Sequence, residues 1–434
     1  MYERRWGLSC RPQLAEFLRS QYDTPELIAA RQWQKLQEHV GFTFAKNRFY
    51  RERLDAIGFE PGDLKDPTDF AKLPILTKED LRVHGDAMIT DGYARDQMLA
   101  VRTGGSTGVP VHLLWDHEAH RFKMAMVKRH DAWAGYQLGM KLASLWGDTE
   151  KARSPKERLF AALCERTVFL DTLLMDEAHM RDFVQTLRRY RPKILIGHAH
   201  SIFFFTEYLE ANGIDDIQFE GIISTAETLA PSERARIESH FGRIVFDRYG
   251  CEEVALIASE CEEHSGLHIS SEGLYVEVLG ASEETPGRIV LTDLSNRGMP
   301  LIRYEVGDLA TLAHGTCTCG RGLPRLGRVY GRVTDVLFAP DGRKISGVSI
   351  LDTFIIHVAG VRQAQIVQDR IDHITLRIVR DANYSQATLD HLNGAVANIF
   401  GVEMRHSIEY VEEIAPTARG KFQFTICNFD PDSP

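Results

Sequence analysis

The segment Thr103-Gly104-Gly105-Ser106-Thr107-Gly108-Val109-Pro110 has the composition of a loop that can hold an anion. It follows the apolar run at 98–101, and residues 111–115 after it predict a strand. Glycine lets the backbone approach a ligand closely, and successive N–H groups form a concave nest for phosphate oxygens. An ordinary hairpin turn is the alternative. A Walker loop is excluded because no Gly-Lys-Ser/Thr ends the segment and a strand follows it.

Cysteine and histidine residues form a second candidate site. Four of the seven cysteines lie within one third of the chain: Cys251, Cys261, Cys317 and Cys319. In a reducing compartment such a cluster indicates a metal before disulfides. Cys261, Cys317 and Cys319 with His268 supply the four ligands of a closed structural zinc site. His264 is a rival fourth ligand, Cys251 is an outside candidate, and four free buried cysteines are the alternative to a metal.

Length and composition limit the class of protein. The chain has 434 residues, 44% hydrophobic and 26% charged, which is typical of a globular protein with a large core. A net charge of −10 without a basic run argues against a nucleic-acid partner. No apolar run reaches the roughly 18 residues of a membrane span. The first residues lack the apolar core of a signal peptide, and we therefore expect a cytoplasmic protein.

The elements that must position these residues alternate between helix and strand. Apolar spacing predicts helices over 25–56, 117–134, 176–191 and 231–241, with Thr77 as the N-cap of a further helix. Another helix begins at His198 and His200 and runs through Phe203 to Asn212. Strands are predicted over 142–146, 193–197, 219–224 and 244–246. Such alternation indicates βαβ units in a largely parallel sheet, which binds ligands at the carboxyl ends of its strands. The glycine loop, 224–227 and 248–250 lie at or just beyond such ends.

The character of the chain changes to β-rich beyond about residue 270. Strands are predicted over 274–279, 288–294 and 331–338, and then over 371–379 and 406–411 with a helix over 385–400 between them. We place a boundary near Gly327–Gly331. The predicted fold class is α/β: an N-terminal domain over 1–330 with βαβ sheets and a β-rich, zinc-bearing part at about 255–330, and a small α+β domain over 331–434.

Six short motifs follow one another along the chain, and their order is more specific than any one of them. They are the glycine loop, Ser224-Thr225-Ala226-Glu227-Thr228, Asp247-Arg248-Tyr249-Gly250-Cys251-Glu252-Glu253, Arg303-Tyr304-Glu305-Val306-Gly307-Asp308, Gly331-Arg332-Val333-Thr334-Asp335 and Pro416-Thr417-Ala418-Arg419-Gly420-Lys421. The ordered set resembles the adenylate-forming superfamily of acyl-CoA synthetases, adenylation domains and luciferases. It is most similar to the phenylacetate–CoA ligase-like branch, which includes capsule-biosynthesis relatives. The resemblance covers nearly the whole chain and implies a mobile C-terminal domain.

The resemblance implies a role for each motif. The backbone of the glycine loop and the hydroxyls of Thr103, Ser106 and Thr107 hold the β- and γ-phosphates of ATP. Tyr249 stacks on adenine, for which a buried strand-end tyrosine is the alternative. Asp308 accepts hydrogen bonds from the ribose, where a lone Gly-Asp is otherwise a turn. The nucleotide-binding residues assigned in these motifs are Thr103, Gly104, Gly105, Ser106, Thr107, Gly108, Ser224, Ala226, Glu227, Thr228, Asp247, Tyr249, Gly250, Cys251, Glu252, Asp308 and Arg332.

Two residues are assigned to catalysis on the same grounds. Glu253 occupies the magnesium-associated position, and Mg²⁺ prefers a carboxylate plus phosphate oxygens. Lys421 corresponds to the lysine that bridges the acid and the α-phosphate, where a solvated surface lysine is the alternative. The chain departs from the family at Glu252, where threonine is usual, and at Thr334, which precedes Asp335 at the hinge. The branch also has a similar Cys/His plus Cys-x-Cys-Gly arrangement, which favours zinc.

The leading hypothesis is ATP-dependent activation of a carboxylic acid, aryl or arylacetic by resemblance, followed by transfer to CoA. One alternative keeps adenylation but uses an amine or a carrier-protein thiol as acceptor. Another is a nucleotide-binding protein without catalysis. His198 and His200 border the acyl pocket by resemblance, with capping or packing as the alternative; Trp146, Phe203 and Phe204 line it or belong to the core. The expected partners are small molecules, and a homodimer is an open alternative to a monomer.

Overall fold

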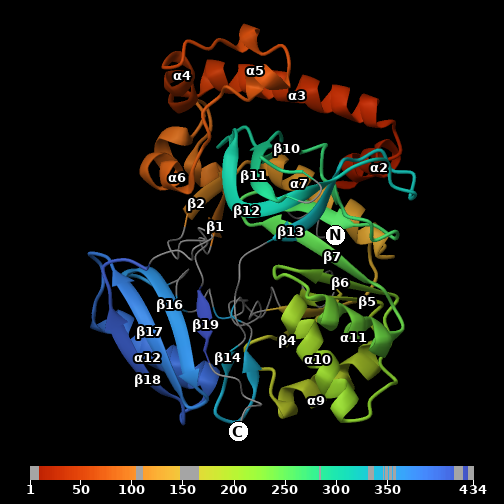
Figure 1. Cartoon of the computed structure of the whole chain (residues 1–434), viewed down its shortest axis with the longest axis vertical. Coiled ribbons are helices and arrows are strands. Elements are labelled where there is room, and N and C mark those ends of the chain that lie inside the picture. Colours follow the sequence, from red (N-terminus) through yellow and green to blue (C-terminus); the bar gives the residue numbers. More distant parts are fainter. Residues whose placement is uncertain are drawn as a thin grey trace. The chain divides into compact units, whose positions relative to one another are not determined.

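The computed structural model describes residues 9–103, 111–146, 166–282, 285–330, 337–345, 347, 350, 354, 358–414 and 424–428, except for the side chains of Arg102, Thr103 and Lys344. The described residues form two compact units (Figure 1). Unit 1 contains residues 9–103, 111–133 and 248–330, and unit 2 contains those of 134–247 and 337–428. The chain passes from unit 2 to unit 1 within strand β7 (Val245–Cys251), between Asp247 and Arg248.

Helices lead into unit 1 and alternate there with short turns. They are α2 (Arg11–Ser20), α3 (Pro25–Lys46), α4 (Arg48–Asp55), α5 (Pro67–Phe70), α6 (Lys78–His84) and α7 (His117–Trp133), with 3₁₀ turns η1 (Pro61–Asp63), η2 (Gly85–Met88) and η3 (Arg95–Gln97). Thr77 is confirmed as an N-cap, because its hydroxyl accepts from Asp80 N and the Asp80 carboxylate accepts from Thr77 N. Among the described residues, no helix combines the length and apolar character needed to cross a lipid bilayer.

The helix predicted over 25–56 is present but is divided at Asn47. Asn47 has extended backbone angles and is buried. Its side-chain oxygen caps α4 by accepting from Tyr50 N, and its amide donates to Met88 O at 2.7 Å. Apolar periodicity continued through this position because the break depends on a polar contact 41 residues away.

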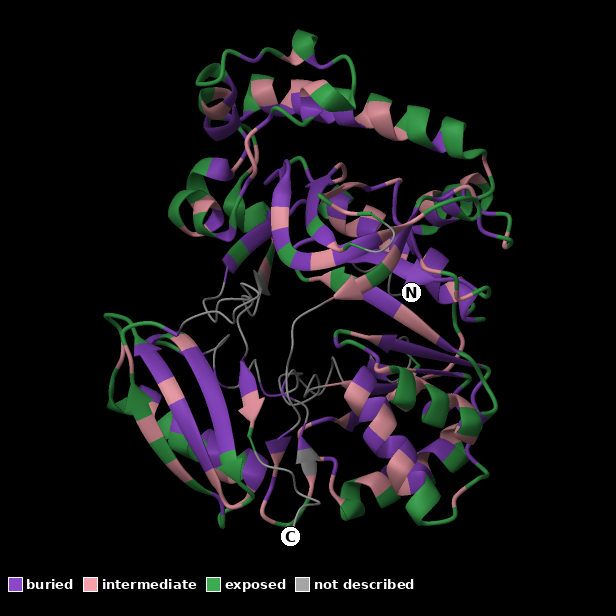
Figure 2. Ribbon diagram, viewed as in Figure 1, coloured by how far each residue is buried: buried purple, intermediate pink, exposed green. Residues whose placement is uncertain are grey.

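The strands of unit 1 form an antiparallel sheet beside a two-stranded ribbon. They are β1 (Leu99–Thr103) and β2 (Val111–Trp115) in the ribbon, and β8 (Ala255–Glu260), β9 (Leu267–Ile269), β10 (Leu274–Leu279), β11 (Gly287–Asp293), β12 (Tyr304–Ala313) and β13 (Arg325–Tyr330) in the sheet. The sheet order is β10-β11-β12-β13-β9-β8, and β8 pairs with the second half of β7. The β-rich prediction is thus confirmed. The strands of this sheet are largely buried (Figure 2). Strand β8 gave no alternating signal because five of its six residues are buried.

The first part of unit 2 is a parallel sheet covered by helices. Its strands are β3 (Leu142–Trp146), β4 (Thr167–Asp171), β5 (Ile194–His198), β6 (Gly221–Thr225) and the first half of β7, and its helices are α9 (Glu177–Tyr190), α10 (Ala199–Ala211) and α11 (Pro231–Phe241). The order β7-β6-β5-β3-β4 is parallel throughout, as the βα alternation predicted. Helix α11 has the predicted bounds, and α10 begins at Ala199, between the two histidines at which its start was predicted.

The last part of unit 2 is the predicted α+β segment. It contains β14 (Leu337–Phe338), β15 (Lys344–Ile345), β16 (Val361–Arg370), β17 (His373–Arg380), α12 (Gln386–Phe400), β18 (Arg405–Tyr410) and β19 (Thr425–Cys427). The four-stranded sheet has the order β18-β17-β16-β19, and its core is shared with α12 (Figure 1). Strand β16 was not predicted because its interior includes glutamines; Gln368 is buried and bonds both backbone groups of Phe338.

Candidate functional site

Tyr249 and Asp308, which are 59 residues apart in the sequence, meet in unit 1. The Tyr249 hydroxyl donates to Asp308 Oδ2 at 3.0 Å, and both residues are buried. Tyr249 lies inside β7 and Asp308 inside β12. The expectation that 248–250 follow a strand end is therefore wrong, because β7 continues past Phe246 to Cys251 by pairing with β8. Asp308 belongs to a strand rather than to the turn that a lone Gly-Asp indicates.

Irregular pairing brings these two side chains together. In β8, Ile257 is an extra residue opposite Tyr249 and Gly250. In β12, the residues 306–308 lie opposite Ile289 alone, and Gly307 within them has a φ of +94°. Bulges of this kind redirect side chains and are frequent beside active sites. Gly250 is needed for the close approach, since a Cβ there would lie 2.6 Å from Ala255 O.

Glu253 follows β7, and both its carboxylate and its carbonyl contact other residues of unit 1. Its carboxylate Oε1 accepts from the Tyr304 hydroxyl at 2.8 Å and lies 3.9 Å from Lys78 Nζ. Its carbonyl accepts from Trp115 Nε1 at 3.0 Å. The carboxylate is 1% exposed and Lys78 is 9% exposed, so water screens this ion pair weakly.

Lys78 and Trp115 were missed by the sequence analysis, and Tyr304 had no role in it. Lys78 begins α6, and Leu76 just before it forms an isolated bridge with Tyr304 at the start of β12. Leu76 N donates to Arg303 O, and Glu305 N donates to Leu76 O, both at 2.9 Å. These long-range backbone hydrogen bonds position Lys78 close to Glu253. No local sequence signal could have predicted them.

Cys251 and Glu252 lie between Tyr249 and Glu253 in the sequence, and their environments differ. Burial raises the pKa of the Cys251 thiol well above its usual value, and the neighbouring Glu253 charge adds to this effect. Glu252, where the family usually has threonine, is exposed. Its extra negative charge is therefore open to screening by water and salt.

The second motif lies in unit 2, where β6 ends. Ser224 pairs in register with Asp247 of β7. Ala226 has a φ of +68°, an uncommon conformation for a residue with a side chain, and both Ala226 and Thr228 are exposed. Ser224 is buried, and its hydroxyl has no hydrogen-bond partner among the described residues. The strained backbone at Ala226 is typical of a functional loop.

Glu227 of the same motif is directed to helix α10. Its carboxylate accepts from His200 N at 2.9 Å and lies 3.3 Å from His200 Nδ1. His200 Nε2 also lies 3.5 Å from Glu233, whose pKa is raised by burial. The side chain of Glu227 thus caps α10. His198 stands at the N-cap position and packs on Trp146 with ring centroids 4.4 Å apart.

The aromatic residues proposed for the acyl pocket divide between two environments. Phe204 is buried in the core of unit 2, and Phe203 packs against that core with Arg236 over its ring at 5.5 Å. Trp146 is half-buried. The core alternative therefore accounts for Phe204.

Several of the predicted nucleotide and catalytic residues lie outside the described residues. They are the side chain of Thr103, and Gly104, Gly105, Ser106, Thr107, Gly108, Arg332 and Lys421. Their roles stay predictions, as does the hinge at 331–335. Of the six motifs, the structure describes Tyr249, Asp308 and Glu253 in unit 1 and, separately, the 224–228 segment in unit 2.

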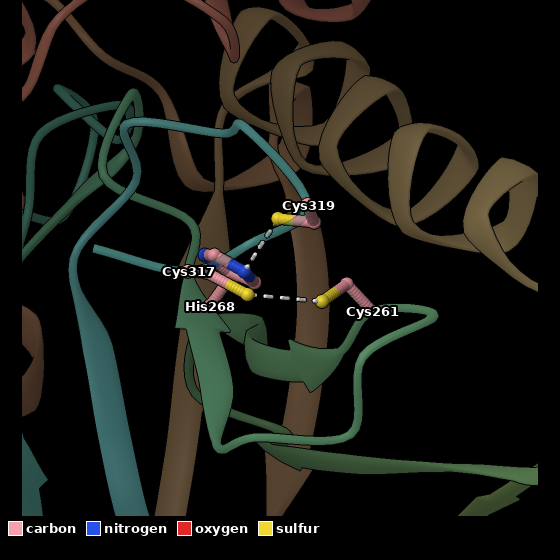
Figure 3. Close-up of side chains that lie close together, drawn as sticks. All are labelled: Cys261, His268, Cys317 and Cys319. Atoms are coloured by element: carbon pink, nitrogen blue, oxygen red, sulfur yellow. Dashed lines mark hydrogen bonds between the residues drawn. The ribbon is translucent and has the colours of Figure 1, made fainter.

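Cys261, His268, Cys317 and Cys319 converge in unit 1 (Figure 3). Their ligand atoms all lie within 4.8 Å of one another. Cys261 Sγ is 3.7 Å from Cys317 Sγ, and Cys319 Sγ is 3.4 Å from His268 Nε2. A tetrahedral zinc with bonds of about 2.3 Å to sulfur and 2.0 Å to nitrogen separates its ligands by roughly 3.5–3.8 Å. The four residues fit that ion.

Strand pairing closes the gap of about 50 residues between the two halves of this cluster. Cys261 directly follows β8, and His268 lies in β9. The two later cysteines lie in the connection from β12 to β13, and β13 pairs with β9 so that Arg325 is opposite His268. The hairpin β8–β9 and the hairpin β12–β13 are thus held edge to edge, and each contributes two ligands.

The orientation of His268 suits a metal ligand. Its Nδ1 lies 3.1 Å from Leu323 O, a contact that fixes this nitrogen as the donor and leaves Nε2 facing Cys319. Burial lowers the pKa of His268 to about 4, so the ring is neutral at pH 7. His264 instead pairs with Glu260 at 3.0 Å, and neither it nor Cys251 belongs to the cluster.

Replacing Tyr249 by phenylalanine tests the pairing with Asp308. The ring remains, but the hydrogen bond to the carboxylate is lost, which leaves a buried acceptor short of one partner. We expect the dissociation constant for ATP to rise about three- to tenfold, the equivalent of roughly 1 kcal/mol for one such bond. Equilibrium titration measures it. Tyr208→Phe, in helix α10 and outside this pair, is the matched control, and an unchanged affinity in Tyr249→Phe would contradict the role of the pairing.

Comparisons with known proteins agree with this arrangement. The family model described as the CapK C-terminal domain matches residues 337–428. The phenylacetate-coenzyme A ligase of Thermus thermophilus is 26% identical over 376 residues, 84% of this chain and 81% of that protein. The enzyme of the same name from Pseudomonas putida is 28% identical over 354 residues, 77% of this chain and 76% of that one.

A solved structure shares the fold. It is 2-hydroxyisobutyryl-CoA ligase in complex with 2-HIB-AMP and CoA in the thioesterification state, which superposes with a TM-score of 0.60 at 20% identity and covers 91% of this chain and 89% of that one. The resemblance inferred from the ordered motifs is thus confirmed. The chain is similar to phenylacetate-coenzyme A ligases over more than three quarters of its length, shares its fold with 2-hydroxyisobutyryl-CoA ligase, and matches the CapK C-terminal domain over residues 337–428.

Proposed function

We propose that this chain activates a carboxylic acid with ATP as an acyl-adenylate, releases pyrophosphate and transfers the acyl group to CoA. The observation that supports it most is the contact of Tyr249 with Asp308. In this proposal the ring of Tyr249 stacks on adenine, and the Asp308 carboxylate beside it accepts hydrogen bonds from the two ribose hydroxyls. Homology to phenylacetate-coenzyme A ligases over more than three quarters of the chain supports the same reaction.

The first half-reaction joins two anions. A carboxylate oxygen of the acid attacks the α-phosphorus of ATP, and the bond from that phosphorus to the pyrophosphate oxygen breaks. Charge neutralisation is the main requirement of such a step. The glycine loop at 103–108 holds the β- and γ-phosphates, and the Lys421 ammonium bridges the acid and the α-phosphate.

Glu253 holds Mg²⁺ in this proposal, and the ion neutralises the phosphate charge when bound. One buried carboxylate completed by phosphate oxygens is a site that Mg²⁺ accepts. The contacts of Glu253 with Tyr304 and Lys78 fix the carboxylate before the nucleotide arrives. Lys78 also offers a second ammonium beside the negatively charged ligands.

The second half-reaction consumes the mixed anhydride. The CoA thiol gives up its proton, its sulfur attacks the acyl carbon, and AMP leaves with the electrons of the broken carbon–oxygen bond. The domain over 331–434 carries Lys421, so its rotation about 331–335 removes the lysine and admits the thiol. Arg332, close to that hinge, contacts the nucleotide.

Zinc in the four-residue cluster has a structural role in this proposal. A closed set of three thiolates and one imidazole leaves no open position for a substrate. An ion held there would tie β9 to the connection between β12 and β13. Of these two strands, β12 contains Asp308.

We also propose a cytoplasmic location, with a homodimer as the alternative to a monomer.

Pyrophosphate release with a panel of carboxylic acids tests the function. We expect release that depends on the acid, with arylacetic acids the fastest, because the homologues named above act on phenylacetate. Mass spectrometry of the product with CoA, an amine or a carrier protein then identifies the acceptor. Absence of acid-dependent release from protein that binds ATP would favour a nucleotide-binding protein without catalysis.

A further inference from the structure

One end of the four-stranded sheet in the C-terminal segment is hollowed. There β16 begins, β17 and β18 end, and the turn 381–385 leads into α12. A groove of about 560 Å³ lies at this end, which is within the range of roughly 300–1,000 Å³ for small-molecule sites. We call it the sheet-end groove and define it by Arg362, Arg380, Asp381, Tyr384, Tyr410 and Glu412.

Two arginines give the groove its positive side. Arg362 lies where the pairing of β16 with β17 shifts register, between the pairs Val361–Arg380 and Gln363–Val379. Its Nη2 donates to Glu412 O at 2.8 Å, which leaves its other guanidinium N–H groups for a ligand. In the described part of the chain, neither Arg362 nor Arg380 forms an ion pair with a carboxylate. Two guanidinium groups of this kind suit a phosphate, which they bind in bidentate fashion.

Two tyrosines form the aromatic side of the groove. The rings of Tyr384 and Tyr410 are perpendicular, with centroids 5.6 Å apart and hydroxyls 3.1 Å apart. The Arg380 guanidinium lies 4.3 Å from the Tyr410 centroid and 5.7 Å from that of Tyr384. This stacking holds the guanidinium plane in place, so that little freedom is lost when a flat group or an anion binds to it.

The remaining groups favour a ligand that carries donors as well as an anion. Asp381 and Glu412 are exposed on the rim, and Asp381 Oδ1 already accepts from Asn383 N. The negative charge of the two carboxylates disfavours a bare anion. Their oxygens can, however, accept hydrogen bonds from an amino group or a hydroxyl of a ligand. The N-terminus of α12 follows Tyr384 directly, and its dipole adds to the positive potential.

We propose that the sheet-end groove binds a phosphorylated adenosine, with the phosphate between Arg362 and Arg380 and the base beside Tyr384 and Tyr410. The inference rests on the proposed function in one respect: CoA carries such a group, an adenosine with phosphates at its 3′ and 5′ positions. The groove then holds the nucleotide end of the acceptor.

Calorimetric titration of the full chain with adenosine 3′,5′-bisphosphate tests the groove. We expect the dissociation constant to rise at least tenfold in the Arg362→Ala/Arg380→Ala double variant. Arg380→Lys keeps the charge but loses the stacked plane, and its effect should be intermediate. Arg370→Ala is the matched control, because Arg370 is an exposed arginine at the other end of β16 and pairs with Asp372.

Separate ligands distinguish the sources of the phosphate. AMP binds at Tyr249 and Asp308, so the double variant should bind it as the wild type does. Absence of bisphosphate binding by the wild type, or equal binding by the double variant, would overturn the proposal. A groove that binds inorganic pyrophosphate as tightly as the bisphosphate is a simple anion site and would also overturn it.

Measuring both pyrophosphate release and bisphosphate binding on the same protein samples distinguishes failure of this inference from failure of the proposed function. Acid-dependent pyrophosphate release by the wild type, together with unaltered bisphosphate binding by the double variant, contradicts the groove alone. Bisphosphate binding that depends on the two arginines, without acid-dependent pyrophosphate release, contradicts the adenylation reaction and leaves the groove assigned.

Discussion

Lys421→Ala is expected to lower the rate of acid-dependent pyrophosphate release at least 100-fold, which corresponds to about 2.7 kcal/mol of transition-state stabilisation. In the proposed reaction the lysine neutralises charge that develops as the carboxylate approaches the α-phosphate, and alanine supplies none. ATP binding should change less than threefold, because the proposal assigns the nucleotide mainly to Tyr249, Asp308 and the glycine loop. Initial rates of release and an equilibrium titration with ATP measure the two quantities.

The control for this variant is Lys193→Ala, which removes an exposed lysine that pairs with Glu220 on the surface of unit 2. That variant should keep the wild-type rate. Lys421→Arg adds a second comparison, since a guanidinium keeps the charge but is larger and planar. Turnover by Lys421→Ala equal to that of the wild type would show that the lysine is an ordinary surface charge.

Cys317→Ser is expected to remove one equivalent of zinc and to lower the midpoint of thermal unfolding by about 10 °C or more, because structural zinc contributes directly to folding. The thiol lies 3.7 Å from Cys261 Sγ, and burial raises the pKa of Cys261 to about 12 when no metal is bound. Metal binding must therefore displace a proton that the free protein holds tightly. Elemental analysis of protein purified without added zinc and a thermal melt measure the effects.

The matched control is Cys427→Ser, at the end of β19 and outside the cluster. It should retain both zinc and the wild-type midpoint. A chelator should reproduce the effect of Cys317→Ser in the wild type and change little in the variant. Wild-type protein that holds no stoichiometric zinc, and melts at the same temperature with or without chelator, would refute the metal site.

The elements of the fold that depend on local sequence signals could be predicted from the sequence. Helix α11, the cap at Thr77 and the parallel order of β3, β5 and β6 follow from periodicity and capping residues within a few positions. The three cysteines and the histidine proposed as zinc ligands were also recognisable, because few other roles gather three thiols and an imidazole. The structure then separated His268 from His264, which spacing had left open.

The features that could not be predicted from the sequence depend on contacts between residues far apart in the chain. The break at Asn47 needs the carbonyl of Met88, and the position of Lys78 needs a bridge from Leu76 to Tyr304. The extension of β7 through Tyr249 needs β8 as a partner, and β8 is buried on both faces. The roles of Tyr249 and Asp308 came from the order of motifs, whereas their hydrogen bond required the folded chain.

The irregular pairing in β8 and β12 has a consequence for protein engineering. Three residues of β12 stand opposite one of β11, and Ile257 interrupts the ladder between β7 and β8. Deleting the extra residues would regularise both ladders and is a natural choice for a designer who seeks thermostability alone. It would also change the local pairing around the hydrogen bond between Tyr249 and Asp308. If these residues bind the nucleotide as proposed, selection for stability and selection for nucleotide binding favour different pairings in this sheet.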